Sequence, residues 1–382
     1  MATVDIPSVS TECFEPAPVT VEGAEALSER LEIHDEAYQL CKEYLKGPWE
    51  SVPKHEFRIS LLQGGLSNKL YICRIPDRYG NSGSQCPCIV ILRIYGLIIK
   101  DFTAQIQESV VFSILAERKL GPKLYAVFPG GRLEEYIPCR ALCTDDIQKP
   151  IMSRYIAQRL SCYHTMSMPV NKQPTTMMKK LLLYHENLVH VQFEDGRKTK
   201  MLRQILRFDI ASEINYIRNL VQDTDSPVVF SHNDVQEGNL LYLEEAGRNA
   251  NPIRMIDFEY SCYNHRGFDI GNHFCEWMYD YSFDEWPHFV YKIENYPTKD
   301  QQTNFIKAYI EEHFTASSTT THDEKWTVAF MIREANRFAL LSHLFWALWS
   351  VMQAKMSDIG FGYMEYAIAR MDAYFKQKLL VE

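Results

Sequence analysis

The segment VVFSHNDVQEGNLLYL, residues 228–243, places a dense group of polar side chains between two apolar runs. Residues 228–230 and 240–243 are typical of short buried strands, so residues 232–239 must form a tight loop between them. A loop that concentrates so many polar groups between strands either faces water or holds a ligand. The rest of the chain indicates which of the two applies here.

Within this loop Asp234 and Asn239 are separated by four residues. The same spacing occurs in the catalytic loop H-R-D-x-x-x-x-N of protein kinases, where the Asp takes the substrate proton and the Asn holds a metal ion. Further on, MIDFEY (255–260) ends an apolar strand with Asp257, where protein kinases have D-F-G. A carboxylate there suits Mg²⁺, which prefers oxygen ligands and usually takes the others from phosphates. A lone Asp at a strand end is usually a turn or cap residue, but the two motifs in this order favour phosphoryl transfer.

Bulk composition excludes several classes of protein. The 382 residues are 46% hydrophobic, enough for two lobes with sizeable cores, and the net charge of -9 disfavours broad docking on nucleic acid or anionic membrane. The N-terminus has neither the basic residues nor the apolar run of a targeting signal, and the most apolar helix candidate, 338–352, is too short to span a bilayer. The ten cysteines form no zinc-like pattern, because the close pair Cys86 and Cys88 has no counterpart. We therefore predict a cytoplasmic protein with reduced thiols and no membrane span.

The hydrophobic pattern divides the chain into three parts. Residues 1–30 show no helical or strand period and predict a flexible tail. Residues 31–138 predict a small, mostly antiparallel β lobe: three strands between 57 and 96, a helix at about 103–119, and two more strands around Gly130. Residues 139–382 predict a larger helical lobe, with amphipathic stretches at 144–166, 200–222, 300–313, 326–355 and 360–378. The expected class is α+β, with a two-lobed fold like that of protein kinases.

The β lobe also supplies candidates for nucleotide binding. The stretch QGGLSNK (63–69) lies between two strands, and its glycines would let backbone N–H groups approach phosphates, although Gly-Gly between strands is often only a hairpin. Arg93 ends the strand VILR, and we expect it to clamp phosphate and to pair with Glu108 of the following helix. Residues 133–138, LEEYIP, lie between the lobes, where a nucleotide base would meet backbone groups.

The residues from 228 onward resemble the choline/ethanolamine kinase family. The resemblance covers nearly the whole chain after the tail and is carried by HNDVQEGNLL (232–241), IDFEYSCYNHRGFDIGNHFCEWMYDY (256–281) and FGYMEYAIARMDAYF (361–375). No G-x-G-x-x-G, D-F-G or A-P-E motif of protein kinases is present. The resemblance implies a kinase-like fold and the reaction of ATP with choline to give phosphocholine and ADP, the first step toward phosphatidylcholine.

The resemblance also implies roles for individual residues. Asp234 corresponds to the catalytic base and Arg93 to a residue that contacts nucleotide phosphates; Asn239 and Asp257 correspond to Mg²⁺ ligands, with Glu259 as a further support of the metal. Gln236 corresponds to a neighbour of the phosphates. The nucleotide-binding positions implied by the family are Gly64, Gly65, Leu66, Ser67, Asn68, Arg93, Glu135, Tyr136 and Ile137. Asp269, His273 and His232 are expected to support the catalytic loop.

An aromatic group in the helical lobe agrees with a quaternary ammonium substrate. Choline has no N–H to donate, so its receptor must offer ring faces, each cation–π contact contributing about 0.5–2 kcal/mol. Trp346 and Trp349 lie on one face of a predicted helix, and the resemblance implies that they bind choline together with Glu276, Tyr281 and Tyr366. The alternative is that these rings only pack in the core.

Three other functions remain open from the sequence. The first is ethanolamine as the main or a second substrate, in which case Trp349 matters little because a primary ammonium can bond to carboxylates. The second is a catalytically silent scaffold, which the presence of Asp234, Asn239 and Asp257 disfavours. The third is a protein kinase, disfavoured by the missing motifs. The expected partners are choline and ATP, with Mg²⁺ as cofactor, and the family resemblance implies a homodimer.

Overall fold

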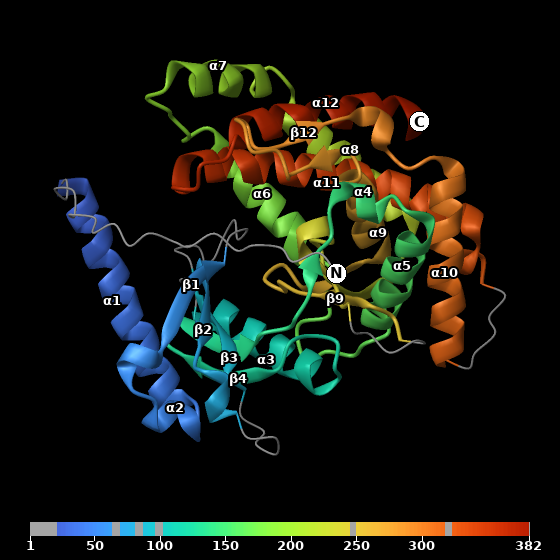
Figure 1. Cartoon of the computed structure of the whole chain (residues 1–382). Coiled ribbons are helices and arrows are strands. Elements are labelled where there is room, and N and C mark those ends of the chain that lie inside the picture. Colours follow the sequence, from blue (N-terminus) through green and yellow to red (C-terminus); the bar gives the residue numbers. More distant parts are fainter. Residues whose placement is uncertain are drawn as a thin grey trace, which may run out of the picture.

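The structure of the protein is a computed structural model that describes residues 21–62, 69–80, 87–95, 102–244, 250–317 and 323–381. Figure 1 shows two lobes: a smaller one built on a sheet, with α1 along its outer side, and a larger, mainly helical one. The two-lobed α+β architecture predicted from the sequence is confirmed. Across the described residues, no helix combines the length and the apolarity that crossing a membrane requires.

The smaller lobe carries a five-stranded antiparallel sheet in the order β1-β2-β3-β5-β4. Its elements are α1 (Val21–Tyr44), α2 (Pro48–Ser51), η1 (Lys54–Glu56), β1 (Arg58–Leu62), β2 (Lys69–Arg74), η2 (Asp77–Tyr79), β3 (Ile89–Ile94), α3 (Phe102–Glu117), β4 (Leu124–Phe128) and β5 (Gly131–Glu135). Alternate residues of β3, Val90 and Leu92, enter an apolar core with Phe57 and Leu133. The register sets Arg93 of β3 directly opposite Arg132 of β5. Cross-strand partners project from the same face, so these two cations must share their counter-ions.

In the larger lobe, helices surround three small antiparallel sheets: β6-β8-β9, β7-β10 and β11-β12. Its first half contains β6 (Arg140–Ala141), α4 (Thr144–Ile147), α5 (Pro150–His164), α6 (Thr176–Leu188), α7 (Gly196–Ile205), α8 (Ile210–Thr224), β7 (Val228–Ser231), η3 (Glu237–Asn239) and β8 (Leu240–Tyr242). Its second half contains β9 (Ile253–Met255), β10 (Cys262–His265), α9 (Arg266–Glu276), β11 (Tyr279–Asp280), β12 (Val290–Tyr291), η4 (Ile293–Asn295), α10 (Lys299–Ser317), η5 (Glu324–Trp326), α11 (Val328–Met356) and α12 (Tyr363–Val381).

Helix α11 forms the centre of the larger lobe and positions much of the site. The Thr327 hydroxyl accepts from the Phe330 amide at 3.2 Å and so caps its start. The helix is apolar on nearly all sides, as expected of a helix buried in a core. Helix α9 approaches it so closely that a Cβ on Gly271 would lie 2.5 Å from the carbonyl oxygen of Ala335, which makes glycine necessary there.

Several helices differ from the sequence-based expectation. Helix α1 begins at Val21, within the stretch predicted as tail, because VEGAEALSER is rich in the helix formers Ala, Leu and Glu; residues 1–20 lie outside the described residues. The amphipathic stretch 200–222 is two helices, since the Asp209 carboxylate caps a new helix by accepting from the Ser212 amide at 3.1 Å. Helices α6 and α9 had no predicted counterpart; α9 directly follows a strand and contains Gly267 and Gly271, which disfavour a helix.

Candidate active site

The loop between β7 and β8 is held in an unusual backbone conformation by buried polar groups. Asn233 has a φ of 69°, a left-handed conformation that Asn tolerates better than most residues. The Asp269 carboxylate, fully buried in α9, accepts from the amides of His232 at 2.7 Å and Asn233 at 2.5 Å, and it also pairs with Nε2 of His164 at 3.0 Å. The loop therefore takes its shape from a distant helix as well as from its own sequence.

Two histidines connect the loop to its surroundings in the neutral state. Nε2 of His232 donates to the Ile256 carbonyl at 2.9 Å, while its Nδ1 accepts from the Asp234 amide at 3.3 Å. Nδ1 of His273 donates to the Val235 carbonyl at 3.0 Å. Burial lowers the pKa of His232, and it lowers the pKa of His273 to about 4. Both side chains thus orient the loop without carrying charge, the role expected for them from the sequence.

Asp234 and Asn239 face each other across this loop. Nδ2 of Asn239 donates to Oδ2 of Asp234 and to its backbone carbonyl, both at 2.9 Å. Asp257 follows β9 with a φ of 64°, and the Asn239 carbonyl accepts from the Ile256 amide at 3.0 Å, which ties the two segments together. The structure thus places the three predicted residues in one constellation.

The region around Asp234 carries excess negative charge. Desolvation raises the pKa of Asp234 well above its ordinary value, and the charges of Glu276, Asp257 and Glu259 raise it further. The pKa of Glu237, a loop residue not predicted from the sequence, is also raised by burial and by Glu276. Clustered carboxylates of this kind are characteristic of sites that bind cations or transfer protons.

Arg93 reaches this cluster from the smaller lobe, but its partners differ from the expected one. Its Nη2 lies 3.3 Å from Oε1 of Glu134, and its Nη1 lies 3.6 Å from Oδ1 of Asp257. Glu108 pairs instead with Arg132 at 2.6 Å, so the predicted pair of Arg93 and Glu108 is wrong. The reason is the register: β5 places Arg132 beside Arg93, and α3 packs against Arg132, whose guanidinium lies 4.1 Å from the ring centroid of Phe112.

The other predicted nucleotide-binding residues differ in position and in hydrogen-bond partners. Glu135 ends β5, and its Oε2 accepts from the Lys123 amide at 3.0 Å; Tyr136 and Ile137 follow it, half-buried, between the lobes. Oε1 of Gln236 accepts from the Gly238 amide at 2.7 Å and caps the turn η3. The predicted cradle, Gly64 to Asn68, lies outside the described residues.

The five residues predicted to bind choline lie together in the larger lobe. Trp346 and Trp349 of α11 meet edge to face, with ring centroids 5.2 Å apart. The Tyr281 hydroxyl donates to Oε2 of Glu276 at 2.8 Å and lies 2.7 Å from the Tyr366 hydroxyl. The two sets are joined through Tyr363, which contacts Trp349, and Phe361, which contacts Tyr363, Tyr281 and Tyr366, with ring centroids 5.0–6.3 Å apart. Helices α9, α11 and α12 and the residue that follows β11 therefore bring one carboxylate and four rings to one place.

Three residues of this group were missed from the sequence. Nε1 of Trp349 donates to the Tyr260 hydroxyl at 2.9 Å, and Nε1 of Trp346 donates to Oδ1 of Asn272 at 2.8 Å. Arg370, fully buried in α12, pairs with Glu276. Its position four residues after Tyr366, on the same helical face, was the available signal.

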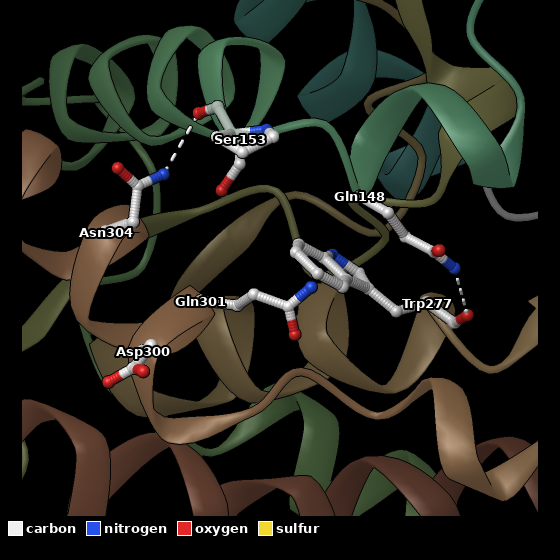
Figure 2. Close-up of a pocket in the computed structure, with 7 residues that line it drawn as sticks. Gln148, Ser153, Trp277, Asp300, Gln301 and Asn304 are labelled. Atoms are coloured by element: carbon white, nitrogen blue, oxygen red, sulfur yellow. Dashed lines mark hydrogen bonds between the residues drawn. The ribbon is translucent and has the colours of Figure 1, made fainter.

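A separate cavity of about 240 Å³ lies between α5 and α10, behind Trp277 (Figure 2). Nε2 of Gln148 donates to the Trp277 carbonyl at 3.1 Å along its edge, and Nδ2 of Asn304 donates to the Pro150 carbonyl at 3.0 Å. None of the residues predicted to be functional lines it.

Comparisons with known proteins agree with this arrangement. The family model described as Choline/ethanolamine kinase matches residues 59–375. The chain is 44% identical to choline kinase alpha of Mus musculus, over 90% of this chain and 80% of that one, and 44% identical to choline/ethanolamine kinase of Homo sapiens, over 90% and 85%. A crystal structure of choline kinase from Cryptosporidium parvum superposes with a TM-score of 0.72 and 26% identity, over 91% of this chain and 96% of that one. With its catalytic loop, its carboxylate cluster and its aromatic group all inside the matched region, the chain belongs to the choline/ethanolamine kinase family.

Proposed function

We propose that this protein transfers the γ-phosphoryl group of ATP to the hydroxyl of choline, giving phosphocholine and ADP. The observation that carries the proposal is geometric: Asn233 of the catalytic loop donates to the Tyr260 carbonyl at 2.9 Å, and the Tyr260 hydroxyl accepts from Trp349 of the aromatic group at 2.9 Å. The charge of Glu276 in the same group also raises the pKa of Asp234. A group suited to a quaternary ammonium and a group suited to proton transfer therefore lie within reach of one small substrate.

Asp234 acts as the base in this proposal. The bond between the choline oxygen and the γ-phosphorus forms, the bond from that phosphorus to the bridging oxygen of ADP breaks, and the hydroxyl proton passes to Asp234. Its raised pKa makes its carboxylate a better proton acceptor than an ordinary Asp. The bond from Asn239, at 2.9 Å, fixes the carboxylate toward the substrate.

The residues present fit a Mg²⁺ ion. Oδ1 of Asp257 is buried and accepts no hydrogen bond from the described residues, and Asn239 commits its amide nitrogen to Asp234, which leaves the amide oxygen for a cation. Among the described residues, no group of three His, Cys, Asp or Glu could hold a metal alone, so phosphates and water would complete the shell. Asp257, Asn239 and Glu259 would hold the ion, whose charge would neutralise the phosphate oxygens.

The nucleotide would lie between Arg93 and the segment Glu135–Ile137. The Arg93 guanidinium is held by Glu134 and Asp257 on the side of the smaller lobe that faces the catalytic loop. Such a fixed guanidinium binds phosphate oxygens at a low cost in side-chain entropy. The backbone between the lobes would receive the base, a contact that depends little on the side chain at position 135.

A second candidate is ethanolamine, alone or beside choline. The observation in its favour is the group of hydroxyls on Tyr281 and Tyr366 beside Glu276, which offers hydrogen-bond acceptors to a primary ammonium. The name of the human relative includes both activities. A homodimer and a cytoplasmic location stay predictions.

An assay of ADP release from ATP and Mg²⁺, with choline and ethanolamine offered in parallel concentration series, tests the proposal. We expect a higher kcat/KM with choline. An equal or higher value with ethanolamine would support the second candidate and leave Trp346 and Trp349 as core residues, while no ADP release with either substrate would favour a silent scaffold.

A further inference from the structure

Arg370 is a cation enclosed within the proposed aminoalcohol site. It is fully buried, and its Nη2 donates to Oε1 of Glu276. Its Nε donates to the Tyr366 hydroxyl at 2.8 Å, and its guanidinium lies 4.3 Å from the ring centroid of Tyr279 and 5.0 Å from that of Tyr366. The guanidinium therefore pairs with the carboxylate of the aromatic group and packs against one of its rings, Tyr366, and against the neighbouring Tyr279.

This arrangement leaves little of the Glu276 carboxylate for a ligand. One oxygen accepts from Arg370 and the other from the Tyr281 hydroxyl at 2.8 Å, while only 2% of the residue is exposed. The carboxylate is therefore already in an ion pair inside the protein, and each of its oxygens already accepts a hydrogen bond.

The consequence differs between the two headgroups. A primary ammonium carries N–H donors that lose their water on entry, and leaving such a donor without an acceptor costs about 1–3 kcal/mol. A quaternary ammonium has no such donors and binds through ring faces. An internal cation that pairs with the Glu276 carboxylate thus weakens the binding of a primary ammonium more than that of a quaternary ammonium.

We propose that Arg370 is a positioning residue that determines specificity: by pairing with Glu276 it withdraws the carboxylate from the ligand and favours a quaternary over a primary ammonium. The inference rests on the proposed function and deepens it, because it concerns the substrate preference of the same site.

The test compares the ratio of kcat/KM for ethanolamine to kcat/KM for choline in three variants. Arg370→Gln frees Glu276 and should raise the ratio about tenfold, the equivalent of one hydrogen bond to a charged group. Arg370→Lys keeps a cation there and should hold the ratio near the wild-type value. The matched control is Arg266→Gln: Arg266 is also fully buried, pairs with Glu334 at 2.7 Å and lies 4.7 Å from the ring centroid of Trp326. This control should leave the ratio unchanged.

A parallel fall of both kcat/KM values in Arg370→Gln, with the ratio constant, would overturn the inference and leave Arg370 a structural residue. If Arg370→Gln does not fold, Glu276→Gln and the double variant Glu276→Gln/Arg370→Gln replace it. The single change leaves an uncompensated cation that repels choline, and the second change should restore choline affinity; no restoration would overturn the inference. An inactive wild-type enzyme would instead overturn the proposed function, and the inference with it.

Discussion

Two groups of charged side chains meet at the candidate site, and they differ in whether their charges balance. In the smaller lobe the cations and carboxylates alternate and balance one another: Arg93, Glu134, Arg132 and Glu108 form one chain of contacts. Burial alone would raise the pKa of Glu134, but Arg93 and Arg132 outweigh it and lower that pKa. The charges of this network are balanced within the protein, although Nη2 of Arg132 has no hydrogen-bond partner among the described residues.

The catalytic cluster in the larger lobe is not balanced in this way. Asp234, Asp257 and Glu259 lie close together, and although Arg93 approaches Asp257 and Arg370 pairs with Glu276, the pKa of Asp234 remains raised. The two groups therefore have different roles. The balanced network fixes the positions of its side chains, while the unbalanced cluster leaves negative charge for bound cations to neutralise.

Among substitutions that test this contrast between the two groups, Asp234→Asn should have the largest effect on activity. Loss of the base should lower kcat by about 10²–10⁴-fold, measured by ADP release. The same change should raise Tm at neutral pH. Because the folded pKa of Asp234 lies above the unfolded one, its contribution to stability is present below the unfolded pKa and is lost as pH rises through the folded pKa. The gain in Tm should therefore vanish in acid; a lower Tm at neutral pH would contradict the description of the cluster.

Asp269→Asn should show how far the cluster depends on its buried support. The substitution weakens the two bonds to the loop amides, and a shift of the loop by about 1 Å can cost about 10²-fold in kcat. We also expect a loss of about 2 kcal/mol in the free energy of unfolding. Asp209→Asn, at the exposed cap of α8, is the control and should change neither quantity measurably. Full activity in Asp269→Asn would mean that the loop holds its shape unaided.

Glu134→Gln should unbalance the network of the smaller lobe. Arg93 and Arg132 would lose their shared counter-ion, and we expect KM for ATP to rise about thirtyfold, the equivalent of about 2 kcal/mol. Its neighbour Glu135 offers a matched control, since its carboxylate meets the exposed Lys123, with the amide at 3.0 Å and the ammonium at 4.0 Å, and its contact with the base would be through the backbone. A Gln side chain keeps an acceptor for the amide, so Glu135→Gln should leave KM near the wild-type value. Equal effects of the two changes would show that the balanced network does not position Arg93.

Trp349→Leu should have the smallest effect of the four and tests the aromatic side of the cluster. Loss of one ring face should raise KM for choline about tenfold, within the range of one cation–π contact. Trp349→Phe keeps a ring but loses the hydrogen bond to Tyr260, so its smaller rise in KM separates the ring from the hydrogen bond. An unchanged KM in Trp349→Leu would return this residue to core packing.

The sequence predicted those parts of the site whose conformation depends mainly on residues close together in the chain. Asp234, Asn239 and Asp257 occupy short loops at strand ends, where neighbouring residues decide the turn. The sheet of the smaller lobe followed from its period of two and its turn residues. Helix α9 was missed although its polar residues recur at helical spacing, because its two glycines lower the helix propensity of a short segment that directly follows a strand.

By itself, the sequence determined the order of the lobes, the catalytic loop and the residue types that the chemistry needs. Only the tertiary structure decided the partners of the charged groups: Glu134 rather than Glu108 for Arg93, and Arg370 for Glu276. The physical reason is that a buried charge must find an opposite charge or a hydrogen bond wherever the packing places one. Strand register and helix packing set those positions, and both depend on residues far apart in the chain.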